Sequence, residues 1–109
     1  MDSMWIELLV VPECAHESAA LEVLTTALVD VGLGSVGFTV TIIDSQEDAD
    51  RRHFIGSPTI CVDGADVFPE PGRPAAVACR LYPGQRAGAP QLRDARQALT
   101  RAAARSTLR

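Results

Sequence analysis

The fold of this chain is decided by the stretch FIGSPTICVDG, which occupies residues 54–64. In it Pro58 is followed at once by four β-forming residues and then by Asp63 and Gly64. Because proline has no N–H to donate inside a sheet and Asp-Gly suits the positive φ angles of a tight turn, the stretch predicts a strand that begins at Pro58 and ends in that turn. At a strand entrance the Ser57–Pro58 peptide bond can be cis, because the tertiary amide lowers the cost of the cis form, but an ordinary trans bond is the commoner case.

A strand, a helix and a second strand are predicted upstream of this stretch. The run WIELLVV, residues 5–11, is almost wholly apolar and stops at Pro12, as in a strand that is buried on both faces. Residues 38–43, FTVTII, are β-branched and largely apolar, which favours a second strand. A strand, a helix and a strand in this order, with a short first connection, predict a βαβ unit with parallel strands. Between the strands apolar residues recur at helical spacing, so a helix is expected that starts at Glu17 and buries Ala20, Leu21, Leu24, Ala27, Leu28 and Val31.

Two more helices and one more strand complete the prediction. Asp44 and Ser45 open a short helix that ends near Phe54. VACRLY, residues 77–82, alternates enough for a fourth strand, which we expect to be antiparallel to the Pro58 strand. The connections on either side of it, residues 68–74 and 83–90, are rich in proline and glycine. A last amphipathic helix follows Pro90, with Leu92, Ala95, Leu99 and Ala102 on one face and Arg93, Arg101 and Arg105 across from it.

These elements predict an α/β protein in the order β-α-β-α-β-β-α, with a mixed sheet of about four strands flanked by helices. With 109 residues and 47% hydrophobic content, we expect one domain over residues 1–109, frayed at about 106–109. The apolar run near the N-terminus is too short for a signal peptide or a membrane span, so we expect a cytoplasmic protein without a membrane partner. In a reducing compartment its three cysteines are expected to be thiols.

Charge is distributed unevenly along the chain. Residues 1–72 carry 13 acidic residues and two arginines, whereas residues 73–109 carry eight arginines and Asp94. The chain has neither interleaved aromatic residues nor zinc-finger spacing, and its calculated isoelectric point is about 5.0. A solvated helix face explains the arginines, and nucleic acid is not expected as a partner.

Several motifs together resemble the thioredoxin-like superfamily, in which a redox cysteine at the start of the first helix faces a cis-proline. A Pro-x-Cys-x-His-Glu turn at residues 12–17 opens the first helix, and Gly-Ser-Pro-Thr at 56–59 opens the later strand. More narrowly, ECAHESAA, FIGSPTICVDG, ACRLY and GAP resemble a group of small bacterial thioredoxin-family proteins, some of them labelled as related to alkylmercury lyase. The resemblance covers nearly the whole chain and implies the fold. It also predicts that the Ser57–Pro58 bond is cis and lies beside Cys14. It leaves the activity open, because this fold hosts redox enzymes, transferases and adaptors alike.

The resemblance implies that any thiol chemistry occurs at Cys14. A thiol at a helix N-terminus meets free backbone N–H groups and the positive end of the helix dipole, and both favour the thiolate. A cationic His16 adds to this effect, whereas Glu13 and Glu17 oppose it by charge repulsion. The sequence does not determine the net sign.

The motif departs from the dithiol pattern of thioredoxin-like reductases. Those enzymes use Cys-x-x-Cys, but Cys14 is followed three residues later by Glu17, so a dithiol cycle within the motif is excluded. A monothiol cycle with a small thiol, a resolving role for Cys79 or Cys61, and no redox function stay open. Cys61 lies in a core-like strand and is expected to be a small buried hydrophobe, which makes Cys79, beside Arg80, the better second thiol.

Three functions therefore compete. In the first, Cys14 is the nucleophile of a monothiol thiol–disulfide oxidoreductase, His16 and Cys79 assist, and the backbone at Ser57, Pro58 and Thr59 binds an extended thiol substrate. In the second, Cys14 binds a thiophilic metal or organomercurial with Cys79 or His16. The third is a non-catalytic adaptor of this fold. The expected partner is a small thiol or disulfide or the thiol of another protein, with no cofactor, and homodimerisation through a sheet edge or helix face stays open.

Overall fold

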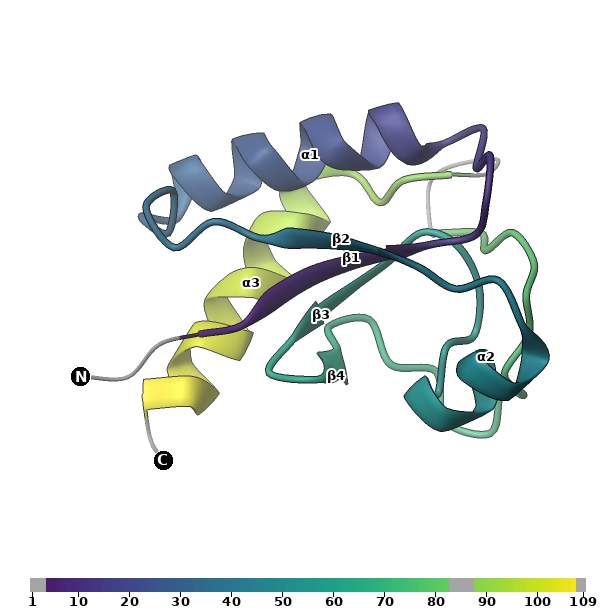
Figure 1. Ribbon diagram of the computed structural model, residues 1–109. Coiled ribbons are helices and arrows are strands. Elements are labelled where there is room, and N and C mark those ends of the chain that lie inside the picture. Colours follow the sequence, from purple (N-terminus) through teal and green to yellow (C-terminus); the bar gives the residue numbers. More distant parts are fainter. Residues whose placement is uncertain (1–3, 83–87, 108–109) are drawn as a thin grey trace.

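One mixed four-stranded sheet forms the centre of the molecule, and helices lie on both of its faces (Figure 1). The computed structural model describes residues 4–82 and 88–107, and of residues 106 and 107 it describes the backbone only. The elements follow the predicted order and are β1 Ile6–Val10, α1 Glu17–Asp30, β2 Thr39–Ile42, α2 Gln46–Arg52, β3 Thr59–Val62, β4 Ala65–Asp66 and α3 Leu92–Thr107. The protein is therefore α/β.

The strands lie in the order β2-β1-β3-β4. β1 and β2 are parallel with Leu8 opposite Val40, as predicted for a strand-helix-strand unit, whereas β3 is antiparallel to β1 with Thr59 opposite Leu9. All five residues of the central strand β1 are buried, which confirms its prediction as a strand covered on both faces. β2 is an edge strand, and its Ile42 is about half exposed at 49%.

The sheet separates two hydrophobic clusters. The first cluster lies between the sheet and the helices α1 and α3, which pack against each other. In Figure 1 α1 runs along the top of the molecule with α3 beneath its C-terminal half. The buried faces are those that the helical spacing predicted, because this cluster holds Ile6, Leu8, Val10, Ala20, Leu24, Ala27, Leu28, Ile60, Val62, Val67, Ala89, Ala95, Ala98, Leu99 and Ala102.

The second cluster lies on the opposite face, which α2 covers (Figure 1). Ser45 caps α2 as predicted, since its side chain accepts a hydrogen bond from the Asp48 N–H at 3.1 Å. The sequence did not predict that a carboxylate is buried on this face. Glu7, the second residue of β1, is 2% exposed, forms an ion pair with Arg52 of α2 and accepts a hydrogen bond from Thr41 at 3.3 Å. The apolar members of this cluster are Leu9, Ile43, Ala49, Phe54 and Cys61.

The fourth strand is not where the sequence predicted it. The Asp63-Gly64 turn, with φ angles of 53° and 86°, returns the chain at once, so β4 is Ala65–Asp66 and pairs antiparallel with β3. Residues 77–82 form no strand, and their one ladder contact is a parallel bridge between Ser57 and Cys79. The predicted antiparallel strand at 77–82 is therefore wrong, because the hairpin occupies the place beside β3 that this strand needs.

Two predictions fall partly outside the residues that the structure describes. The first is the connection predicted at 83–90, of which residues 83–87 lie outside the described part. The second is the fraying predicted at 106–109, where residues 106 and 107 are described and have a helical backbone. Within the described residues, no helix is both long enough and apolar enough to cross a lipid bilayer.

Candidate functional site

Cys14 lies in the turn that joins β1 to α1. The helix begins at Glu17, whose N–H donates to the Cys14 carbonyl over 3.2 Å, and His16 is its N-cap residue. Cys14 thus precedes the helix by three residues rather than lying in its first turn. Glu13 before it has a φ of 54°, a left-handed conformation that is uncommon for residues other than glycine. Cys14 packs against the first cluster and is half-buried.

The sulfur of Cys14 accepts a hydrogen bond from the hydroxyl of Ser57. The Ser57 Oγ to Cys14 Sγ distance is 3.1 Å, and the Val11 N–H donates to the same hydroxyl oxygen at 3.1 Å. Ser57 is completely buried, so the hydroxyl has no water to turn toward. With its oxygen engaged by Val11, its single proton is directed at the sulfur. Such a bond is stronger when the acceptor is a thiolate than when it is a thiol.

The Ser57–Pro58 peptide bond is cis and lies beside Cys14, as predicted. The predicted substrate-binding residues Ser57, Pro58 and Thr59 are nevertheless all buried. The Thr59 hydroxyl donates to the Gly56 carbonyl at 2.6 Å and is one of the groups that pair with a buried arginine. The side chain of Thr59 therefore supports the fold and does not face a substrate.

The backbone of Ser57 is already paired within the chain. Its N–H donates to the Ala78 carbonyl at 2.7 Å, and its carbonyl accepts from the Arg80 N–H at 2.9 Å. We call residues Ala78–Tyr82 the docked segment. Because this segment occupies the strand-like bonding groups of Ser57, an extended substrate cannot use them in the conformation described.

Arg80 anchors the docked segment. Its side chain is completely buried, and its guanidinium bonds to the Thr59 hydroxyl at 3.0 Å, to the Asp66 carboxylate at 2.8 Å and to the Phe68 carbonyl. Within the described residues its Nε is buried without a hydrogen-bond partner. The guanidinium also lies over the Tyr82 ring, 4.7 Å from the ring centre. Removal of this side chain is costly, because the buried partners that it satisfies lose their bonds.

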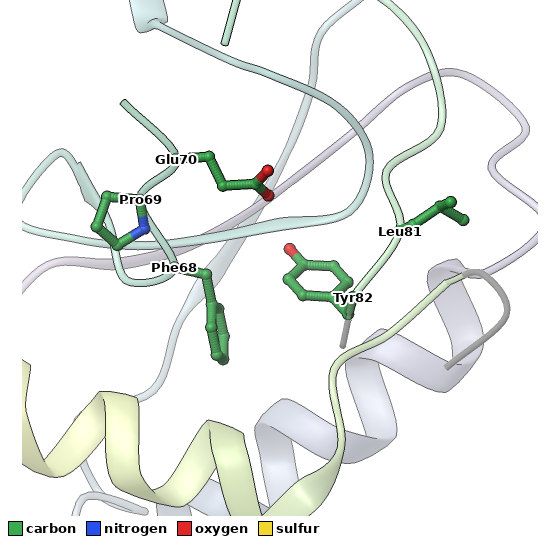
Figure 2. A pocket seen from close by; sticks show the side chains of 5 residues that line it. All are labelled: Phe68, Pro69, Glu70, Leu81 and Tyr82. Carbon is green, nitrogen blue, oxygen red and sulfur yellow. The ribbon is translucent and has the colours of Figure 1, made fainter. Parts of the chain in front are cut away.

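A surface pocket of about 450 Å³ is lined in part by Leu81 and Tyr82 of the docked segment. Figure 2 shows the Phe68 and Tyr82 side chains near each other at this pocket, with the Glu70 carboxylate above them. The two rings pack edge to face, with their centres 5.3 Å apart. A hydrogen bond from Arg73 holds the pKa of Glu70 below its ordinary value. Neither Cys14 nor His16 lines this pocket, whose lining residues are Phe68, Pro69, Glu70, Leu81 and Tyr82. The pocket therefore marks where the docked segment meets the loop after β4, rather than the thiol site.

His16 lies against the backbone of Gly88. A Cβ atom placed on Gly88 comes 2.7 Å from the imidazole Nδ1, and the φ of Gly88 is +84°. The His16 side chain makes no capping hydrogen bond to α1. The contact that the structure gives the imidazole is thus with the chain before α3, and the predicted assistance to Cys14 stays a prediction.

The two other cysteines differ sharply in their surroundings. Cys61 is buried in β3, and desolvation, with smaller contributions from Asp66 and Glu7, raises its pKa from 9.0 to about 12. It is therefore protonated and inaccessible at neutral pH, as predicted for a small buried hydrophobe. Cys79, in contrast, is exposed on the docked segment.

Part of the site could not be predicted from the sequence. Ser57 was expected to act through its backbone, whereas its hydroxyl is the group that touches Cys14. The burial of Arg80 was also unexpected, although one arginine in the short alternating run ACRLY, with Asp66 and Glu70 upstream, is a signal for a buried ion pair.

No group of three or more His, Cys, Asp or Glu side chains is arranged to hold a metal ion within residues 4–82 and 88–105. Comparison of the chain with protein-family models, with curated proteins and with solved structures found no significant match.

Proposed function

We propose that this chain is a thioredoxin-like protein whose Cys14 attacks disulfides as a single nucleophilic thiol. The fold assignment is supported by the sheet order β2-β1-β3-β4, by α1 and α3 on one face with α2 on the other, and by the cis Ser57–Pro58 bond next to the cysteine that follows β1. The motifs around residues 13–20 and 54–64 support the same assignment.

The observation that carries the proposal is the pair of hydrogen bonds through Ser57. Val11 N–H donates to the Ser57 oxygen, and the Ser57 hydroxyl donates to the sulfur of a half-buried Cys14. A buried hydroxyl held in this orientation stabilises negative charge on the sulfur, and the thiolate is the nucleophilic form. A cysteine with only a packing role needs no donor aimed at its sulfur.

The reaction follows from the position of the accessible thiol. The Cys14 thiolate attacks one sulfur of a disulfide R–S–S–R, an S–S bond forms between Cys14 and that sulfur, and RS⁻ leaves and takes up a proton from water. Glu17 occupies the position where a dithiol enzyme has its second cysteine, so no thiol of the motif can release the bound RS group. The mixed disulfide on Cys14 is therefore the species to detect.

Intact-mass measurements with glutathione disulfide test the proposal. In Cys79→Ser the protein should gain one glutathione, mapped to Cys14, whereas Cys14→Ser reports the reaction of the exposed Cys79. At pH 7 we expect Cys14 to react about tenfold faster than Cys79, although Cys79 is more exposed. Ser57→Ala in the Cys79→Ser background should slow the reaction of Cys14 about tenfold, which corresponds to one hydrogen bond to a charged group of about 1.4 kcal/mol.

Two outcomes would contradict the proposal. If Cys14 forms no adduct, or reacts no faster than Cys79, the adaptor function becomes the better one. If Ser57→Ala retains a parent-like thermal transition and an unchanged rate at Cys14, the hydroxyl does not activate the sulfur.

A further inference from the structure

The docked segment holds Cys79 at a defined place beside Ser57. Ser57 and Cys79 are partners in a parallel bridge, formed by the bonds of the Ser57 N–H and carbonyl to the residues on either side of Cys79. Neighbouring strands in a sheet lie about 4.8 Å apart, which sets the separation of the two backbones. Cys79 is therefore next to the residue whose hydroxyl touches Cys14.

The side chains that anchor the segment follow Cys79 closely in the sequence. One residue later, the buried Arg80 is bonded to Thr59 and Asp66. Three residues later, the Tyr82 hydroxyl donates to the carbonyl of Pro58. Glycine at position 56 allows this close approach, because a Cβ atom added to it would lie only 2.8 Å from the Arg80 Cβ. An exposed cysteine on a segment with so many contacts has a restricted position, unlike one in a free loop.

Two observations place the Cys79 side chain on the same side of the sheet as Cys14. Bridge partners direct their side chains to the same face, and the side chain of Ser57 points to Cys14. Arg80 points to the opposite face, where its partners Thr59 and Asp66 lie in register with Leu9 and Cys61. Successive residues of an extended segment alternate between faces, so Cys79, which precedes Arg80, points toward the face of α1 and Cys14.

We propose that Cys79 is the resolving cysteine of this protein, an inference that rests on the proposed function of Cys14. Cys14 and Cys79 flank Ser57 on one face, and both reach solvent. Cys61 cannot serve, because it is buried on the opposite face. The protein thus carries a working dithiol whose second cysteine lies on the docked segment. In Cys-x-x-Cys motifs, by contrast, the second cysteine lies on the first helix.

The substrate class is a low-molecular-weight disulfide, and the steps balance. Attack by Cys14 on R–S–S–R leaves RS on Cys14 and releases the first RS⁻. The Cys79 thiolate then attacks the sulfur of Cys14, the Cys14–SR bond breaks, and the second RS⁻ leaves. Both RS⁻ ions take up protons, so the disulfide is reduced to two RSH while the protein is oxidised to a Cys14–Cys79 disulfide. Two external thiols reverse the sequence.

Glutathione disulfide in slight excess over the reduced protein tests the inference. The parent should end with two hydrogens lost and no retained glutathione, and proteolysis should yield a peptide pair linked through Cys14 and Cys79. In Cys79→Ser the glutathione adduct on Cys14 should live at least about tenfold longer than in the parent. Cys61→Ala is the matched control, and it should behave as the parent does.

The contrary outcomes separate this inference from the proposed function. If Cys14 forms its adduct rapidly but the adduct lasts as long in the parent as in Cys79→Ser, the resolving role is wrong and the monothiol function stands. A crosslink through Cys61 would also overturn the assignment. If no adduct forms at Cys14, both proposals fail. Thermal unfolding of each serine variant, expected to match the parent, excludes a folding defect as the cause.

Discussion

At the scale of the residue, three cysteines of one short chain have three different surroundings. Cys14 is half-buried and accepts a hydrogen bond from a buried hydroxyl, Cys61 is buried among apolar side chains, and Cys79 is exposed. The thiolate is the reactive form, and burial without a donor suppresses it. Reactivity should therefore differ among the three thiols although their chemistry as free amino acids is the same.

The burial of Cys61 predicts a loss of stability in alkali. Desolvation raises the pKa of Cys61 from 9.0 to about 12, and burial raises the pKa of Tyr82 as well. The unfolded chain ionises first, so the stabilisation is complete below pH 9 and is lost as the pH rises from 9 to 12. Cys61 alone should account for about 3 to 4 kcal/mol over this interval.

Urea unfolding between pH 8 and 11 measures this effect. The free energy of unfolding should fall with pH in the parent and fall less steeply in Cys61→Ala, where Tyr82 continues to contribute. Equal slopes in the two proteins would show that Cys61 ionises as easily in the folded state as in the unfolded state.

At the scale of the element, α1 packs against both β1 of the sheet and α3. Its buried residues are Ala20, Leu24, Ala27 and Leu28, and Val29, one residue further along, is 64% exposed. The difference follows from the 3.6-residue period, which turns adjacent positions by about 100°. One helix thus offers a buried and an exposed apolar position for comparison.

Leu24→Asp should prevent folding, and Leu28→Asp should act in the same way. Either change places an unpaired carboxylate in the first cluster at a cost of several kcal/mol, against a total stability of roughly 5 to 15 kcal/mol. Val29→Asp is the matched control, because its side chain reaches water, and it should change the free energy of unfolding by less than about 0.5 kcal/mol. A cooperative thermal transition of Leu24→Asp near that of the parent would mean that the buried face is misassigned.

At the scale of the whole molecule, the site depends on segments that are far apart in the sequence. The turn after β1 supplies Cys14, the entrance to β3 supplies Ser57, and the docked segment supplies Cys79. Gly56 lies directly against the docked segment, because its α-carbon faces the Arg80 Cβ and its φ of +145° suits glycine. The site is thus held together by tertiary contacts at one end of the sheet.

Gly56→Ala should destabilise the protein through this contact. The added Cβ comes 2.8 Å from the Arg80 Cβ, and overpacking of this kind costs about 1 to 3 kcal/mol in addition to the strain of the positive φ. Gly72→Ala is the control, since Gly72 also has a positive φ, +87°, but has open space around its α-carbon. Denaturant unfolding of both variants should show the larger loss for Gly56→Ala. Equal losses would show that the segment moves aside without cost.

The sequence by itself determined the three helices and the first three strands. Proline at 58, Asp-Gly at 63–64 and the apolar spacing of residues 20–31 act through neighbours in the chain, so their effects can be read locally. The same is true of the serine cap of α2, whereas the cis bond before Pro58 was predicted from the resemblance that the motifs at residues 12–17 and 56–59 carry.

Only the tertiary structure decided which strand closes the sheet and what surrounds each thiol. Residues 77–82 alternate as a strand does, yet the Asp63-Gly64 turn brings Ala65 and Asp66 to β3 first, because a two-residue turn closes at a smaller entropic cost than a longer loop. The burial of Arg80 depends on Thr59 and Asp66, which no local pattern connects to it. The contact of Ser57 with Cys14 and its bridge to Cys79 likewise join residues that are distant in the chain, and such contacts exist only once the sheet has brought them together.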